Sequence, residues 1–204
     1  MKNSNTIVQG LPLFEYQLVL NPHEELRNKI MNVKQHVFDT YKASAALYSK
    51  PFVTLVYFTG LQQMEAKVVN RLQTIAMGCP PLKIELKDFG SFPSHSIFIN
   101  VTSKVQVQQL VKTIRTEARH LMKINSDHAP HFMMEPTMAI ARKLLPWQFE
   151  KAWLQYRHRS FTGRFIADAM LLLKRPVGGT RYEIVSRFEF RHLPVTTTQG
   201  MLFA

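Results

Sequence analysis

Lys50-Pro51-Phe52-Val53-Thr54-Leu55 and Glu135-Pro136-Thr137-Met138-Ala139-Ile140 are the two stretches of sequence that decide the fold. They lie 85 positions apart, and each is a proline followed by residues typical of a β-strand. Alternate residues of a strand share a face, so Phe52 and Thr54 point one way, as do Thr137 and Ala139. The two stretches are therefore a weak internal repeat, with one such strand in each half of the chain.

Hydrophobic spacing predicts the elements on either side of these two strands. Helices are expected from about 24 to 41, 64–75, 103–121, where Ser103 is a candidate cap, and 146–156. Strands are expected at 14–20, 52–58, 82–86, 95–101, 137–144, 161–174 and 181–190, and a loop at 124–135. Several strands follow one another with no helix between them. This order favours an α+β fold over a doubly wound parallel sheet.

Composition is that of a folded domain: 46% of the 204 residues are hydrophobic, enough for a sizeable core. The longest apolar run, 169–173, is far shorter than the roughly 20 residues that a membrane helix needs. The polar start of the chain leads into no apolar segment of signal-peptide length. A single cysteine, Cys79, cannot form an internal disulfide. These features predict a cytoplasmic protein with no membrane partner.

The net charge of +12 favours polyanionic partners such as RNA, although the basic residues are scattered along the chain. No glycine-rich phosphate loop is present, and the histidines lack metal-ligand spacing, so no cofactor or metal is expected. The expected organisation is a flexible arm over residues 1–12, one bilobal domain over 13–193, and a flexible tail over 194–204.

The two strand stretches resemble the paired motifs of the 2H phosphoesterase superfamily, which includes 2′-5′ RNA ligase-like proteins and cyclic phosphodiesterases. That family carries two His-x-Thr/Ser motifs, often preceded by proline. Here Pro51-Phe52-Val53-Thr54-Leu55 stands for Pro-His-x-Thr-Leu, and Pro136-Thr137-Met138-Ala139-Ile140-Ala141-Arg142 stands for Pro-His-x-Thr-Ile-Ala-Arg. With the element order, the resemblance covers roughly residues 13–193. It implies an α+β fold of two pseudo-symmetric lobes, with antiparallel sheets and flanking helices around a central cleft.

The departures from the family's pattern bear on function. The family's two histidines act as acid and base on 2′,3′-cyclic phosphates or 2′-5′ linkages, which requires groups that titrate near neutral pH. Phe52 has no proton to exchange, and the Thr137 hydroxyl is too weak an acid or base. Thr54 keeps its phosphate-holding hydroxyl, whereas Ala139 has lost it. The resemblance therefore implies a catalytically impaired protein that binds RNA ends or nucleotide phosphates through Thr54, Thr137, Arg142 and Lys143.

Three other interpretations remain open. A displaced histidine, His131 or His95, would make the protein an active cyclic phosphodiesterase or 2′-5′ RNA ligase; His128 lies in the same loop as His131. His95-Ser96 imitates the motif only superficially, because neighbouring residues of a strand face opposite ways. The chain would otherwise be a protein-interaction module without a small ligand, or an unrelated α+β domain in which Thr54 is simply a strand residue.

Overall fold

The two motif strands, β3 (Val53–Leu61) and β7 (Thr137–Ala141), lie antiparallel to each other at the centre of one curled sheet. The computed structural model describes residues 7–8, 11–48 and 50–193. Within this part of the chain, β3 and β7 meet through a single register pair, Val53 with Met138. Opposite positions of an antiparallel pair share a face, so this register sets Phe52 beside Ala139 and Thr54 beside Thr137. The two motifs are thus brought together from distant parts of the sequence.

Each motif strand forms the inner edge of a four-stranded antiparallel half-sheet. The continuous order is β10-β9-β2-β3 and then β7-β5-β4-β8. The remaining strands of the first half are β2 (Leu11–Leu20), β9 (Ala169–Pro176) and β10 (Glu183–Glu189). Those of the second half are β5 (Ser96–Val101), β4 (Leu82–Phe92) and β8 (Thr162–Ala167). Two short strands, β1 (Ile7–Val8) and β6 (His131–Phe132), pair with β2 and β3.

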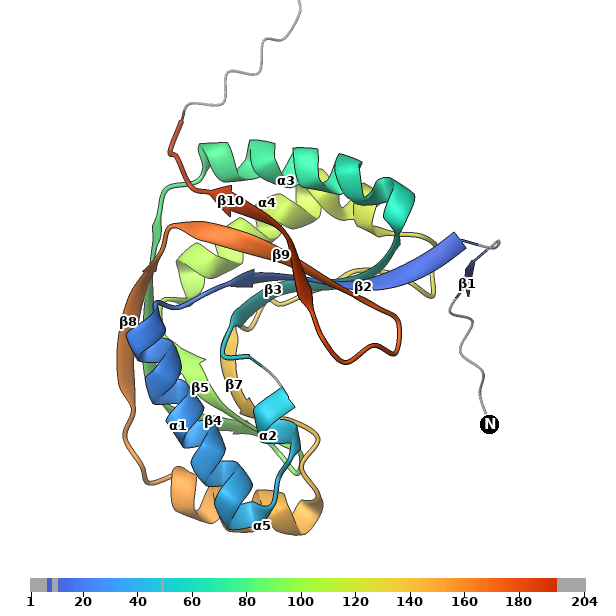
Figure 1. Cartoon of the computed structure of the whole chain (residues 1–204). Helices are drawn as coiled ribbons and strands as arrows, with labels where there is room; N and C mark the ends of the chain where they lie inside the picture. The colour runs from blue at the N-terminus through green and yellow to red at the C-terminus, as the bar shows by residue number, and fades with distance from the viewer. Residues whose placement is uncertain (1–6, 9–10, 49, 194–204) are drawn as a thin grey trace, which may run out of the picture.

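Helices cover the outer face of each half-sheet (Figure 1). Helices α3 (Glu65–Gly78) and α4 (Lys104–Met122) pack over the first half, and α1 (Glu24–Tyr41) and α5 (Pro146–Tyr156) over the second. One short helix, α2 (Ala45–Tyr48), and one 3₁₀ turn, η1 (Gln62–Met64), precede and follow β3. The predicted α+β fold of two half-sheets with flanking helices is confirmed. The cleft described below lies on the inner side of the sheet, where Ala45 of α2 also contributes to its lining.

The expected strand 161–174 is wrong in one respect, because it divides at Asp168 into β8 and β9. These strands belong to different halves of the sheet, so the chain crosses between the halves at this residue. The predicted loop 124–135 contains β6. Ser103 stands at the start of α4 without capping it, because its hydroxyl instead accepts a hydrogen bond from the Glu85 amide at 3.0 Å.

The expected flexible ends fall largely outside the described residues. Of the predicted arm 1–12, the structure describes only Ile7–Val8 and 11–12, where β1 pairs with the beginning of β2. The predicted tail 194–204 lies wholly outside them. Among the helices that are described, none combines the length and the hydrophobicity needed to cross a bilayer.

Candidate functional site

A cleft of about 620 Å³ opens on the inner side of the curled sheet, where the two motif strands meet. Phe52 and Thr54 of the first motif and Ala139 of the second contribute to its lining. Basic side chains surround them: Lys50, Arg142, Lys143, Arg175 and Arg181. No Asp or Glu is among the described residues that line the cleft. The cleft therefore carries a positive field suited to an anion.

Both motif strands contain a β-bulge at equivalent positions. On β3 the register shifts from Leu18–Val56 to Val19–Thr54, which leaves Leu55 as an extra residue. On β7 it shifts from Phe98–Ala139 to Ile97–Ala141, which leaves Ile140 as the extra residue. Leu55 and Ile140 are separated by the same 85 positions as the motifs themselves. The internal repeat therefore includes the backbone irregularity as well as the side-chain pattern.

Each bulge reverses the alternation of side chains beyond the motif. In a regular strand, Tyr57 would face away from Thr54, because three positions separate them. The extra residue Leu55 turns Tyr57 to the cleft, opposite Gln17 in register. In the second repeat, Arg142 is the counterpart of Tyr57 and lies two residues after the bulged Ile140. Arg142 also lines the cleft.

Hydrogen bonds connect these residues across the two halves. The Arg142 guanidinium donates to the Tyr57 hydroxyl at 3.0 Å. The Gln17 side-chain amide donates to the same hydroxyl at 3.1 Å and to the Thr54 hydroxyl at 2.8 Å. Thr54 is only 4% exposed, and Gln17 is partly buried beside it. One chain of polar groups thus links the first motif with the basic residue that follows the second.

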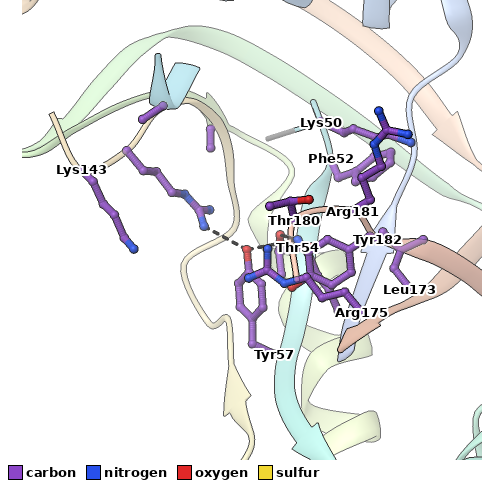
Figure 2. Close-up of a pocket in the computed structure, with 14 residues that line it drawn as sticks. Lys50, Phe52, Thr54, Tyr57, Lys143, Leu173, Arg175, Thr180, Arg181 and Tyr182 are labelled. Atoms are coloured by element: carbon purple, nitrogen blue, oxygen red, sulfur yellow. Dashed lines mark hydrogen bonds between the residues drawn. The ribbon is translucent and has the colours of Figure 1, made fainter. Parts of the chain in front are cut away.

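An apolar wall lies beside these residues, in the same first half-sheet. It consists of Val19, Leu171 and Leu173, with Phe52 and Tyr182 packed against them. The Arg175 guanidinium lies 4.6 Å from the centre of the Tyr182 ring and forms an ion pair with Glu15 at 2.6 Å. Figure 2 shows Phe52, Tyr182 and Arg175 gathered on one side of the view, with Lys143 on the opposite side. Apolar and basic side chains are thus interspersed on this side of the cleft.

The structure brings together most of the residues that the sequence singled out. Thr54, Arg142 and Lys143 line the cleft together with Phe52 and Ala139. Lys143 has a left-handed backbone, with φ of 55°, a conformation that costs energy in a non-glycine residue and often marks a functional site. Thr137 is half-buried on β7 and is not among the lining residues.

The histidines proposed as replacements lie outside the lining of the cleft. His95 is exposed in the turn between β4 and β5, where its Nδ1 lies 2.9 Å from the Pro93 carbonyl oxygen. His128 is held in its loop by the side chain of Asn125. His131 is exposed on β6 directly opposite Tyr57 in register, so its side chain projects on the cleft side of the sheet.

Two further residues were not foreseen as neighbours of the site. Lys34 of α1 is fully buried behind β7, where its ammonium donates to the carbonyl oxygens of Ala139 at 3.1 Å and Ile140 at 2.9 Å. Burial, with repulsion from Arg142, lowers the pKa of Lys34 to about 7.

Gln17 gave no sequence signal because it belongs to neither motif. Cys79 lies away from the cleft, and burial raises the pKa of its thiol.

Comparison with known proteins agrees with this architecture. The chain resembles the LigT protein of E. coli in complex with 3′-AMP, with a TM-score of 0.64 at 15% identity over 87% of this chain and 98% of that one. LigT in complex with NADP⁺ gives 0.61 at 13% identity over 88% and 99%. A protein of Thermus thermophilus gives 0.58 at 16% identity over 87% and 98%. No curated protein matches the sequence.

The sequence itself supports an assignment beyond the shared fold. The family model of the 2′-5′ RNA ligase superfamily matches residues 21–179, which include both motif strands and all four long helices. The cleft between two repeated half-sheets, with one motif in each, is where that resemblance predicts the site. The chain therefore belongs to the 2′-5′ RNA ligase superfamily.

Proposed function

We propose that this protein binds RNA ends or nucleotide phosphates in the cleft and is catalytically impaired toward 2′,3′-cyclic phosphates. The observation that carries the proposal is the charge of the lining: five basic side chains and no carboxylate among its described residues. Thr54, Arg142 and Lys143 are suitably placed to contact phosphate oxygens. The Phe52 ring and the apolar wall offer a surface on which a base can stack.

The proposed impairment rests on the side chains that occupy the motif positions. Phe52 stands at the first histidine position and has no proton to exchange, and the Thr137 hydroxyl at the second is too weak an acid or base at neutral pH. Acid and base groups each contribute about 10²- to 10⁴-fold to a rate, so loss of both would leave turnover near background. The single cysteine, Cys79, supports a reducing, cytoplasmic setting for such a protein.

Binding is tested with a short fluorescent single-stranded RNA whose affinity is measured from low to moderate salt. If three to five phosphates are contacted, log K should fall with log[salt] with a slope of about −2 to −3.5. Lys143→Ala should weaken binding and reduce the magnitude of this slope by about 0.7, which is the contribution of one phosphate contact. Lys112→Ala, on the exposed face of α4, is the matched control. Absence of binding even at low salt would favour a protein-interaction module instead.

Catalysis is tested with nucleoside 2′,3′-cyclic phosphates as substrates. We expect turnover close to the uncatalysed rate. The competing function is an active phosphodiesterase or 2′-5′ RNA ligase that uses His131, and its position opposite Tyr57 is the observation in its favour. Turnover well above background that disappears in His131→Ala, or in His95→Ala, would establish the enzyme and overturn the impaired protein.

A further inference from the structure

The Tyr57 hydroxyl has both of its acceptor positions occupied. It receives one hydrogen bond from Arg142 at 3.0 Å and one from Gln17 at 3.1 Å. A guanidinium and an amide –NH₂ can only donate, so neither takes up the phenolic proton. A phenol has one proton to donate, and within the described residues that proton has no acceptor. The Tyr57 hydroxyl, which lines the cleft, is thus left as a donor.

The Thr54 hydroxyl is in the same situation. Its oxygen accepts the second N–H of the Gln17 amide at 2.8 Å, and its own proton remains to be donated. One amide group therefore holds both oxygens and takes up neither proton, and both residues line the cleft. A guanidinium has five N–H donors, and Arg142 uses one of them in its hydrogen bond to Tyr57. Other N–H groups of Arg142 are left for a ligand.

We propose that Tyr57 and Thr54, held by Gln17, donate together with Arg142 to the terminal phosphomonoester of a nucleotide or RNA end. This inference rests on the proposed function and names its ligand class. A phosphomonoester has about two negative charges and three oxygens that only accept, which matches three converging donors. A 2′,3′-cyclic phosphate has one charge and two such oxygens. The site therefore prefers the opened ester to the cyclic one.

Tyr57 is a residue that the motif pattern does not mark. It enters the site only because Leu55 is bulged out of the β3 ladder. Its counterpart in the second repeat is Arg142, the same residue that donates to it, 85 positions away. The two equivalent positions thus form one contact between the halves. A phosphate that binds there is held by both halves of the protein at once.

The test measures binding of 3′-AMP, 5′-AMP, inorganic phosphate and 2′,3′-cyclic AMP by calorimetry at one fixed low salt concentration. For the natural chain, we expect at least one monoester to bind about 10-fold or more tightly than the cyclic ester. Comparison of 3′-AMP, 5′-AMP and inorganic phosphate identifies the position of the phosphate and the contribution of the nucleoside. Tyr57→Phe, which removes a single oxygen, should weaken the preferred monoester about 10- to 100-fold.

Two companion variants sharpen the result. Gln17→Glu replaces the donor by a group that only accepts, which draws both hydroxyl protons away from the cleft and adds a negative charge. It should weaken monoester binding more than Tyr57→Phe does. Tyr16→Phe removes a hydroxyl outside the lining of the cleft, where it donates to Glu65 at 3.0 Å, and should change the affinity less than twofold. Thermal unfolding of each variant verifies that the fold is retained.

The outcomes separate this inference from the proposed function. If the natural chain binds a monoester and Tyr57→Phe binds it equally well, the hydroxyls donate to the Gln17 oxygen and this inference is overturned alone. Preference of the natural chain for the cyclic ester overturns the assigned ligand class. If the natural chain binds none of the four ligands nor any RNA, the proposed function itself fails.

Discussion

The triple variant Phe52→His, Thr137→His and Ala139→Thr should hydrolyse nucleoside 2′,3′-cyclic phosphates about 10⁴-fold faster than the natural chain, or more. The expectation follows from restoring both proton-transfer groups, each of which contributes about 10²- to 10⁴-fold. Imidazole has its ordinary pKa near 6.5, so both protonation states are available at neutral pH. Initial rates measured with each cyclic nucleotide, for the natural chain and the triple variant in parallel, provide the comparison.

The register of the motif strands is the structural reason to expect this gain. Pairing of Val53 with Met138 sets position 52 beside 139, and 54 beside 137. Each restored imidazole therefore lies beside the threonine of the other motif. Because Thr137 does not itself line the cleft, the longer histidine side chain is needed there to reach the substrate. Arg142 and Lys143 already supply positive charge.

Partial restorations act as controls for the triple variant. Phe52→His alone supplies one of the two groups and should recover only a small part of the gain, since acid and base act on the same substrate. It also removes the Phe52 ring from the apolar wall, so thermal unfolding should be recorded beside the rates. A folded triple variant that remains at background would show that the cleft has diverged beyond the three motif positions.

Periodicity was sufficient to predict the four long helices and most of the strands, but not the short helix α2. The four long helices begin and end within a few residues of the predicted ranges, because their apolar stripes pack against the sheet. Asp168 illustrates a limit of such patterns. The run 161–174 has strand character throughout, so nothing in its alternation shows that Asp168 separates strands of two different half-sheets.

The candidate site shows a second limit, which concerns backbone irregularity. Strict alternation places Tyr57 on the face opposite Thr54, and only the bulge at Leu55 corrects this. A bulge is decided by pairing with another strand, which local sequence does not reveal. The repeat itself did contain a signal: Tyr57 and Arg142 occupy equivalent positions after the two motifs. Tyr57 lies only two residues beyond Leu55, and Arg142 two residues beyond Ile140.

The natural chain should gain stability as the pH rises above neutral, and replacing Lys34 by methionine should remove this gain. Lys34 is fully buried, and its folded-state pKa of about 7 lies well below the 10.5 of a free lysine. Between these values the unfolded chain binds one more proton than the folded chain does. The free energy of unfolding therefore rises with pH in this window, at up to about 1.4 kcal/mol per pH unit. Below pH 7 both states are protonated and the slope vanishes.

The buried lysine provides hydrogen bonds to the backbone of the β7 bulge. A bulge takes Ile140 out of the regular ladder, and the Lys34 side chain donates to the carbonyl oxygens of Ile140 and Ala139. In the first half, the carbonyl of the equivalent residue, Leu55, accepts from the Met133 backbone amide at 2.9 Å. A neutral amine still has two N–H groups, so the hydrogen bonds survive deprotonation while the cost of burying a charge is relieved.

Urea unfolding of the natural chain and of Lys34→Met at pH 7, 8 and 9 tests this expectation. The difference in unfolding free energy should move in favour of the natural chain by roughly 2 kcal/mol over this range. Burial raises the pKa of Tyr156 and Tyr182 to about 12, which lowers stability above about pH 10, but both proteins share those residues. The exposed Lys112→Met should show no such change. A difference between Lys34→Met and the natural chain that stays constant with pH would mean that Lys34 remains charged, and that the carbonyls of the bulge are strong enough acceptors to hold a buried ammonium beside Arg142.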